Sequence, residues 1–315
     1  MTSALLLTAG LGTRLRPLSD VRAKPAVPVA GEPLVRRSLA WLASQSIRDV
    51  VLNLHHRPAT ITAVVGDGSD LGVRVRYSWE QPRVLGSAGG PRKALPLVDA
   101  DPLLIVNGDT LTDVKVAELE AAHARSGAVV TLALVPNIDH QHYGGVVLDD
   151  DRRVTGFVSR GPAAAGSFHF IGVQIAARRV FEPLPLDEPF ATIGGVYDDW
   201  IRTNRGAIRG FVSAAGFWDI GTAADYWRTS HELAVRARHA NALGGRGCTI
   251  HPFARVTRSI LWDDVEIGPD AVIEECIVTD GVKVTGRAVY RRSILVAGQD
   301  GVVASPLDTG ERPSE

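Results

Sequence analysis

The segment Leu5–Val35 reads LLLTAGLGTRLRPLSDVRAKPAVPVAGEPLV. Its apolar start and the glycines that follow predict a buried strand at Ser3–Leu7 that ends in a turn. Gly10 and Gly12 have no Cβ, so the backbone there can take positive φ and come close to a ligand. Consecutive amides in such a turn can hold phosphate oxygens. We therefore expect the signature loop, Leu7–Pro33, to handle phosphate.

Polar side chains after the glycines strengthen this expectation. Thr13 offers a hydroxyl, Arg14 a fixed fork of donors, and Lys24 a compact positive charge. Two common phosphate-binding patterns do not fit. A P-loop needs lysine directly after its second glycine, and the dinucleotide fingerprint needs a third glycine where this chain has Leu15. The prolines of the loop indicate a stiff, extended segment rather than the start of a helix.

Predicted strands and helices alternate after the signature loop. The expected strands are Asp49–Leu54, Val73–Trp79, Leu103–Val106 and Val129–Val135, and the expected helices are Leu34–Gln45, Pro58–Val65 and Lys115–Arg125. Apolar strands that alternate with helices predict an α/β fold, with a Rossmann-like, mostly parallel sheet covered on both faces. From Tyr143 onward, further predicted elements suggest a lid or a substrate wall. They are Gly145–Leu148, Val154–Val158, Phe168–Ile175, Gly195–Thr203 and Ala223–Arg238.

The C-terminal part has a different pattern. Aliphatic residues recur about every six positions, as in Ile250 and Val256 or Ile267 and Ile273, which is typical of a hexapeptide-repeat β-helix. An antiparallel meander is the alternative. We expect a first domain over 1–240, a short left-handed β-helix over 245–298, and a disordered tail over 299–315.

Composition narrows the class of protein. The 315 residues suggest two domains, and 45% hydrophobic and 22% charged residues are ordinary for a globular protein. A net charge of -1 gives no basic field for nucleic acid, and no apolar run is long enough to span a membrane. Two cysteines and no signal segment fit a reducing compartment. We expect a cytoplasmic protein with neither nucleic acid nor membrane as a partner.

Two aspartates follow predicted strands. Asp109 ends the stretch PLLIVNGD, so it would lie at the carboxyl edge of the sheet, where open α/β sheets bind ligands. Asp219 lies in GFWDIGTAADY, before a helix that Thr222 could cap. By itself the second stretch looks like a strand followed by a capped helix. Magnesium with substrate phosphates needs only one or two protein carboxylates.

The signature loop resembles that of the sugar-phosphate nucleotidyltransferase family, which reads G-x-G-T-R-L-x-P-L-T and later P-K-P-x-x-P-V. This chain matches from Gly10 through Pro17 and from Lys24 through Val29. Ser19 replaces a threonine of the pattern, and Ala23 a proline. The family's central N-G-D and late W-x-D-I-G-T-P also occur here in the same order, with an alanine for the last proline.

The resemblance assigns roles to these residues. It implies that the loop holds the triphosphate, that Arg14 assists the transferring phosphoryl group, and that Lys24 contacts phosphate. It also implies that Asp109 and Asp219 share a Mg²⁺ ion. The catalytic set is then Arg14, Lys24 and Asp109, and the loop residues that bind the nucleotide are Ala9, Gly10, Gly12 and Thr13.

Base and sugar contacts are less sharply defined. Leu85–Ala88 resembles the family's L-G-T-A stretch, which implies nucleotide contacts at Gly86 and Ser87. Glu80 or Gln81 could read a base edge. A glutamate would accept from the N–H groups of guanine, whereas a glutamine suits a pyrimidine, so the base stays open. The residues implied to bind the sugar phosphate are Gly144, Gly145 and Arg160. The family's E-K-P is absent, since serine and arginine stand in its place at 159 and 160.

The resemblance implies an enzyme that joins an NTP to a sugar 1-phosphate by in-line displacement of pyrophosphate, with mannose-1-phosphate guanylyltransferases as the favoured group. The missing E-K-P motivates an alternative, namely a non-catalytic homologue that binds a nucleotide sugar and regulates a partner. We also expect a homo-oligomer formed through the C-terminal domain.

Overall fold

The computed structural model describes residues 3–237 and 243–308. The chain divides into two compact units, and each unit combines three separate segments of the sequence. The first unit contains Met1–Gly10, Val35–Pro58 and Val65–Trp218. The second contains Leu11–Leu34, Ala59–Val64 and Asp219–Glu315. Most of the signature loop therefore folds with the C-terminal part of the chain and not with the sheet from which it emerges.

Four parallel strands form one side of the sheet of the first unit. They lie in the order β6-β1-β4-β5, with bounds Leu103–Asn107, Ser3–Leu7, Asp49–Leu54 and Arg74–Trp79. Ala4 is in register with Leu104 on one side and with Val50 on the other. Parallel strands end at the same edge, so the turn after β1 and the turn after β6 are neighbours. The backbone N–H of Gly108 donates to the carbonyl oxygen of Leu7 at 2.9 Å.

The rest of the sheet is largely antiparallel. β11 (Phe168–Ala176) pairs antiparallel with both β6 and β8 (Val130–Pro136), and β12 (Ile208–Val212) pairs parallel with β8. β9 (Gly145–Leu148) and β10 (Val154–Val158) extend the sheet beyond β11. The expectation of a mostly parallel sheet holds only for β6-β1-β4-β5, because apolar patterning does not encode strand direction. The strands of the predicted lid or wall extend the same sheet, whereas its last predicted helix belongs to the second unit.

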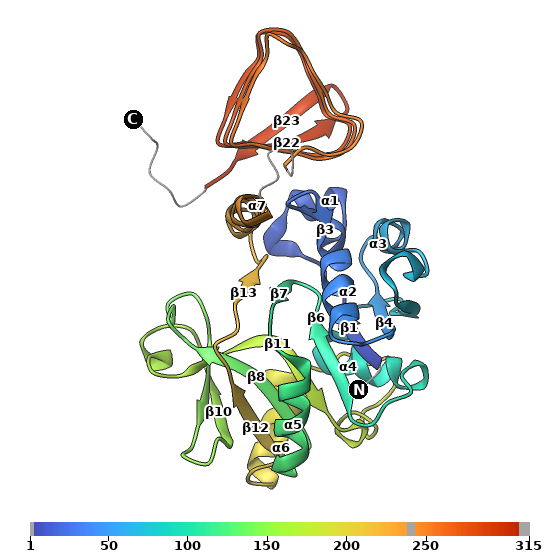
Figure 1. Cartoon of the computed structure of the whole chain (residues 1–315), viewed down its shortest axis with the longest axis vertical. Helices are drawn as coiled ribbons and strands as arrows, with labels where there is room; N and C mark the ends of the chain where they lie inside the picture. The colour runs from blue at the N-terminus through green and yellow to red at the C-terminus, as the bar shows by residue number, and fades with distance from the viewer. Residues whose placement is uncertain (1–2, 238–242, 309–315) are drawn as a thin grey trace. The chain divides into compact units, whose positions relative to one another are not determined.

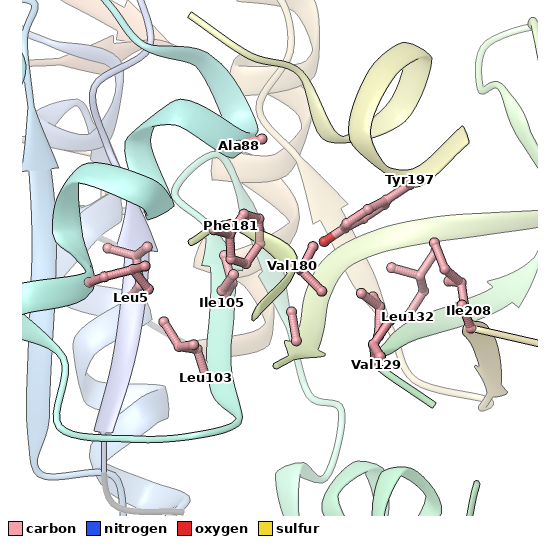
Figure 2. Packing of buried hydrophobic residues seen from close by; sticks show 14 of the residues in the cluster. Leu5, Ala88, Leu103, Ile105, Val129, Leu132, Val180, Phe181, Tyr197 and Ile208 are labelled. Carbon is pink, nitrogen blue, oxygen red and sulfur yellow. The ribbon is translucent and has the colours of Figure 1, made fainter. Parts of the chain in front are cut away.

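Helices and buried side chains complete this unit. The helix α2 (Leu34–Ser44) buries Val35, Leu39 and Leu42 completely, as their helical spacing predicts. Leu5 and Ile105 of the parallel strands contribute to one buried cluster, which also holds side chains of the antiparallel strands (Figure 2). The other helices are α4 (Gly86–Ala94), α5 (Val116–Ser126) and α6 (Tyr197–Thr203). No helix among the described residues is long and apolar enough to cross a bilayer.

The β-helix lies in the second unit and has three faces (Figure 1). Its strands pair in parallel from coil to coil, with successive coils offset by 17 residues. One face contains β14 (Thr249–Ile250), β17 (Glu266–Ile267) and β20 (Lys283–Val284); the next contains β15 (Arg255–Thr257), β18 (Val272–Glu274) and β21 (Val289–Arg291); the third contains β16 (Ile260–Leu261), β19 (Ile277–Val278) and β22 (Ser293–Gly298). This parallel pairing confirms the β-helix and excludes the meander.

The predicted disordered tail is wrong over its first part. Gly301–Pro306 forms β23, which pairs antiparallel with β22 along its whole length. The strand covers the free edge of the last coil, and an edge strand gains stability from such pairing. Residues 309–315 of the predicted tail lie outside the described residues.

The second unit also contains α7 (Ala223–Ala237) and the short elements of the signature loop. Thr222 caps α7, since its hydroxyl accepts from the N–H of Asp225 and donates to the Asp225 carboxylate. The loop is not purely extended, because it forms a single helical turn α1 (Leu18–Val21) and the strands β2 (Pro28–Val29) and β3 (Glu32–Pro33).

Candidate functional site

The signature loop folds back on itself at Gly12. Gly12 has φ 63°, in the left-handed region that favours glycine, and its carbonyl oxygen accepts from the Ser19 hydroxyl at 2.9 Å. A Cβ at this position would lie 3.1 Å from the Cβ of Ser19 and 3.3 Å from that of Lys24. The turn therefore brings the glycine close to Lys24. Gly10 has open space around it, so sterics alone do not require a glycine there.

The cations of the loop differ in exposure. Arg14 and Thr13 are exposed, whereas Lys24 is buried with only 8% of its surface accessible. A buried lysine has fewer rotamers available than an exposed one, so Lys24 loses less conformational freedom when a ligand binds. The exposed guanidinium of Arg14 keeps its freedom to follow a ligand.

Asp219 lies beside Arg14 in the second unit. A Cβ at Gly221 would be 2.9 Å from a carboxylate oxygen of Asp219, 3.2 Å from one of Asp225, and 3.4 Å from Nη1 of Arg14. The absence of a side chain at Gly221 thus leaves room for three charged groups. The structure brings the predicted metal ligand and the predicted catalytic arginine together within one unit.

Asp225 is a charged residue of this region that the sequence analysis missed. It is buried, its Oδ2 accepts from the N–H and the hydroxyl of Thr222, and its Oδ1 pairs with Arg228 at 2.6 Å. The spacing T-x-x-D before an apolar helix predicts this capping box. Asp225 holds the start of α7 and thereby the segment that carries Asp219.

Asp109 lies in the first unit, directly after β6. Its position depends on Gly108, where a Cβ would be only 2.4 Å from the carbonyl oxygen of Leu7. No side chain fits between these two backbone segments. The glycine therefore allows the turn that presents the Asp109 carboxylate at the carboxyl edge of the parallel strands.

Glu80 has a different environment from the one predicted. It is fully buried, its Oε1 accepts from the Asn53 amide at 2.7 Å, and its Oε2 accepts from the Leu85 N–H at 2.6 Å. Asn53 in turn accepts from the N–H of Thr8, at the start of the signature loop. Both carboxylate oxygens already accept hydrogen bonds from the protein. Glu80 therefore fits a structural role better than recognition of a base. Its neighbour Gln81 is exposed.

Glu80→Gln should lower the free energy of unfolding by about 1–3 kcal/mol, because an amide nitrogen cannot accept from either partner and leaves a buried donor unsatisfied. Urea denaturation at pH 7 measures this change. Glu188→Gln, at an exposed glutamate of the same unit, is the control and should change the free energy by less than about 0.5 kcal/mol. Equal stability of the two variants would contradict the anchoring role.

Glu80 should also make the stability of the fold depend on pH. Burial raises the pKa of Glu80, and hydrogen bonds from Leu85 and Asn53 only partly offset this effect. The folded chain therefore retains the proton to higher pH than the unfolded chain, and stability should fall as pH rises from 4.5 through the folded pKa. This contribution should vanish in Glu80→Gln, as denaturation curves across pH 4 to 8 would show.

Gly86 and Ser87 pack against a neighbouring segment. Gly86 has φ 75°, and a Cβ there would lie 2.7 Å from the carbonyl oxygen of Phe190. The Ser87 hydroxyl accepts from the N–H of Thr192 at 2.8 Å. The N–H groups of Ala88 and Gly89 also donate to the Phe190 carbonyl. Some donors at the start of α4 are thus already satisfied within the protein.

The residues predicted to bind the sugar phosphate lie near one another. A Cβ at Gly144 would lie 3.8 Å from the backbone N of Arg160, and one at Gly145 would collide with the hydroxyl of Ser167. Gly144 and Arg160 are exposed, whereas Gly145 is buried. Gly144 and Arg160 can therefore face a ligand, whereas the packing around Gly145 leaves no room for a side chain at that position.

An aromatic cluster, missed by the sequence analysis, follows these glycines in the first unit. The rings of Tyr143 and His169 have centroids 4.2 Å apart, and Phe217 lies 4.8 Å from His169. Burial and the nearby His142 lower the pKa of His169 to about 4, against a hydrogen bond with the backbone of Gly144 that raises it. His169 is therefore neutral at pH 7. The alternation in F-H-F at 168–170 is the only sequence signal for it.

The donors predicted for a metal are hard oxygens. Asp109 and Asp219 both offer carboxylates, and both are partly accessible. Carboxylates of this kind suit Mg²⁺. The donor chemistry therefore fits the cofactor that the sequence resemblance implies.

Comparison with known proteins identifies the family. The family model described as Nucleotidyl transferase matches residues 3–235, and the one described as GlmU-like, C-terminal hexapeptide matches residues 230–301. The chain belongs to the nucleotidyl transferase family. The resemblance to sugar-phosphate nucleotidyltransferases is thereby confirmed, and so is the prediction that the chain is an enzyme of this class.

Similar proteins of the nucleotidyl transferase family have names that give different substrates. A mannose-1-phosphate guanylyltransferase of Mycobacterium tuberculosis is 30% identical and aligns over 92% of this chain and 83% of its own length. An N-acetylmuramate alpha-1-phosphate uridylyltransferase of Neisseria meningitidis is 34% identical over 77% of this chain and 98% of its own. The structure of HddC from Yersinia pseudotuberculosis complexed with GMP-PN has a TM-score of 0.65 and 25% identity, and covers 74% of this chain and 100% of that one.

Proposed function

We propose that this nucleotidyltransferase transfers a nucleoside monophosphate from GTP to mannose 1-phosphate, or to a closely related sugar 1-phosphate, and releases pyrophosphate. The observation that carries the proposal is the grouping of Gly12, Lys24, Arg14 and Asp219 within one compact unit. A narrow turn, a fixed ammonium group, an exposed guanidinium and a carboxylate are the groups that a triphosphate and its counter-ion need.

The reaction needs no covalent intermediate on the protein. An oxygen of the sugar 1-phosphate attacks the α-phosphorus of the NTP, a new P–O bond forms, and the bond to the bridging oxygen of pyrophosphate breaks. Arg14 and Lys24 would neutralise the charge that builds up on the phosphates, and the turn at Gly12 would orient the triphosphate. A divalent cation, when bound by Asp109 and Asp219, would add charge neutralisation at the phosphates.

Guanine is the favoured base because of the similar proteins, since an amide side chain such as that of Gln81 does not by itself discriminate between bases. Guanylyltransferases for mannose and heptose 1-phosphates are among the similar proteins, at 30% and 32% identity. Gln81 is exposed at the end of β5, so its amide can both donate to and accept from a base edge. We assign the base contact to Gln81 and withdraw it from Glu80, whose oxygens are occupied.

The sugar side rests on Arg160 and Gly144. Arg160 is exposed and can pair with the phosphate of the sugar in place of the missing lysine. The Ser159–Arg160 pair also supports a second candidate, in which the chain binds a nucleotide sugar without turnover and regulates a partner. A cytoplasmic location accompanies either candidate, because their ligands are cytoplasmic metabolites.

A panel of reactions tests the proposal. The chain is incubated with Mg²⁺, each of GTP, UTP, dTTP, CTP and ATP, and each of several sugar 1-phosphates, and pyrophosphate release is measured. We expect the highest kcat/KM with GTP and mannose 1-phosphate. In parallel, the shift in Tm with each NTP reports which base is bound. No product with any pair, together with a Tm shift from a nucleotide sugar, would favour the regulatory candidate.

A homo-oligomer formed through the β-helix is part of the proposal. The β-helix exposes large apolar side chains, with 75% of Phe253 and 53% of Val289 accessible. Exposed apolar side chains of this size can be buried against a second copy of the chain. Sedimentation equilibrium of the whole chain, beside Phe253→Ser, would show whether this surface holds copies together.

A further inference from the structure

Arg22 connects the signature loop to the β-helix within the second unit. Its Nε donates to Oδ2 of Asp280 at 2.7 Å, and its Nη2 donates to Oδ1 of Asp280 at 2.6 Å and to Oδ2 of Asp263 at 2.8 Å. The two carboxylates come from successive coils, since Asp263 follows β16 and Asp280 follows β19. The two-point contact with Asp280 fixes the orientation of the guanidinium plane.

This ion group is sheltered from water. The accessible fraction of the side chain is 13% for Arg22, 22% for Asp263 and 30% for Asp280. The guanidinium also lies over the ring of Trp262, 5.5 Å from its centroid. Burial works against the charge of Arg22, but its hydrogen bonds with Asp280 and Asp263 raise its pKa overall. The group is therefore charged at pH 7.

A second connection holds the loop farther along. The hydroxyl of Tyr226, on α7, donates to the carbonyl oxygen of Pro28 at 2.7 Å and accepts from Nε1 of Trp262 at 2.8 Å. Trp262 and Tyr226 are both fully buried. Trp262 thus contributes to both connections, through its ring at Arg22 and through its N–H at Tyr226.

Lys24 lies between these two connections. It follows Arg22 by two residues, and its Cβ packs close to Gly12 at the turn of the loop. Arg22 is held on one side of it and Pro28 on the other. The two connections therefore restrain the backbone that carries Lys24.

We propose that the β-helix positions the signature loop for catalysis: Asp263 and Asp280 hold Arg22, and Arg22 in turn fixes Lys24. Arg22 is then a positioning residue, and the β-helix is part of the machinery for nucleotidyl transfer. The expected effect on kcat/KM rests on the proposed function, whereas the expected effect on the structure of the loop does not. A misplacement of about 1 Å at a phosphate-binding group can reduce a rate about 100-fold.

The test compares Asp280→Asn with Glu266→Gln. The control removes a carboxylate from the same β-helix, where Glu266 pairs with Lys283 at 2.7 Å and both side chains are more than half exposed. Each variant is assayed as the full chain for kcat and KM, and for hydrogen exchange of backbone amides. Leu15, Ala26 and Val27 are informative, since their N–H groups donate to carbonyls within the loop.

For Asp280→Asn we expect at least about a tenfold faster exchange of these loop amides, while amides of β1 keep their protection. The value of kcat/KM should fall about 10- to 100-fold, whereas Glu266→Gln should stay within about twofold. Arg22→Lys, which keeps the charge but loses the two-point contact, should show the same changes to a smaller degree.

Unchanged loop exchange and unchanged kcat/KM in Asp280→Asn would overturn the proposal. If Asp280→Asn fails to fold, Arg22→Lys decides in its place by the same two measurements. If the unmodified chain forms no product with any substrate pair, the proposed function fails, and loop exchange still decides whether the β-helix positions the loop.

Discussion

Replacing Asp109 with asparagine should lower kcat for nucleotidyl transfer on the order of 10³-fold, because a charged oxygen ligand near the phosphates becomes a neutral amide. The substitution keeps the shape of the side chain, and Gly108 continues to determine the turn. The fold should therefore survive. Pyrophosphate release at saturating substrates, with Mg²⁺ varied from low to high concentration, is the measurement.

Asp150→Asn is the matched control for Asp109. It removes the same charge from an exposed turn of the first unit, and its kcat should stay within about twofold of the unmodified chain. Asp109→Asn should also require more Mg²⁺ for its residual activity. An Asp109→Asn variant with full turnover would show that this carboxylate does not serve the metal.

Arg14→Lys is expected to have the second largest effect, a decrease in kcat on the order of 10²–10³-fold. Lysine retains the positive charge but loses the planar fork that matches two phosphate oxygens at once. Arg14 is exposed, so stability should change little. Single-turnover kinetics with saturating NTP separate this loss in the chemical step from a loss in binding.

Arg16→Lys provides the comparison within the same loop. Arg16 is an exposed arginine that pairs with Asp20 at 3.2 Å, an ion pair of little energetic weight. Its kcat should remain near that of the unmodified chain. An equal decrease in kcat in the two variants would mean that the loop tolerates no arginine-to-lysine change. Such a result would contradict a specific role of Arg14.

Most strands and helices could be predicted from the sequence because their patterns are strong and local. The strands Asp49–Leu54 and Gly145–Leu148 and the helix Pro58–Val65 begin and end where their patterns predict. The helix α4 was missed, because GSAGGPRKA contains three glycines and a proline and has low helix propensity. Its formation depends on packing, including the Phe190 carbonyl that accepts from its first amides.

Long-range contacts account for the rest of what the sequence left open. The partners of Arg22 lie 241 and 258 positions away in the chain, so no local pattern links them. The same is true of β23, whose pairing with β22 gives order to a polar segment that looks disordered by itself. For Glu80, the side-chain chemistry alone permits base recognition. Its burial, which the sequence does not reveal, gives it a structural role instead.

The ion group around Arg22 also has a consequence for the order in which the protein becomes functional. A ribosome synthesises the signature loop well before the carboxylates that hold Arg22, which lie 241 and 258 positions later in the chain. N-terminal segments generally fold first during synthesis. The parallel strands can thus assemble early, whereas the loop reaches its final position only after Asp280 has left the exit tunnel. An incomplete chain would carry the signature loop without the contacts that make it competent.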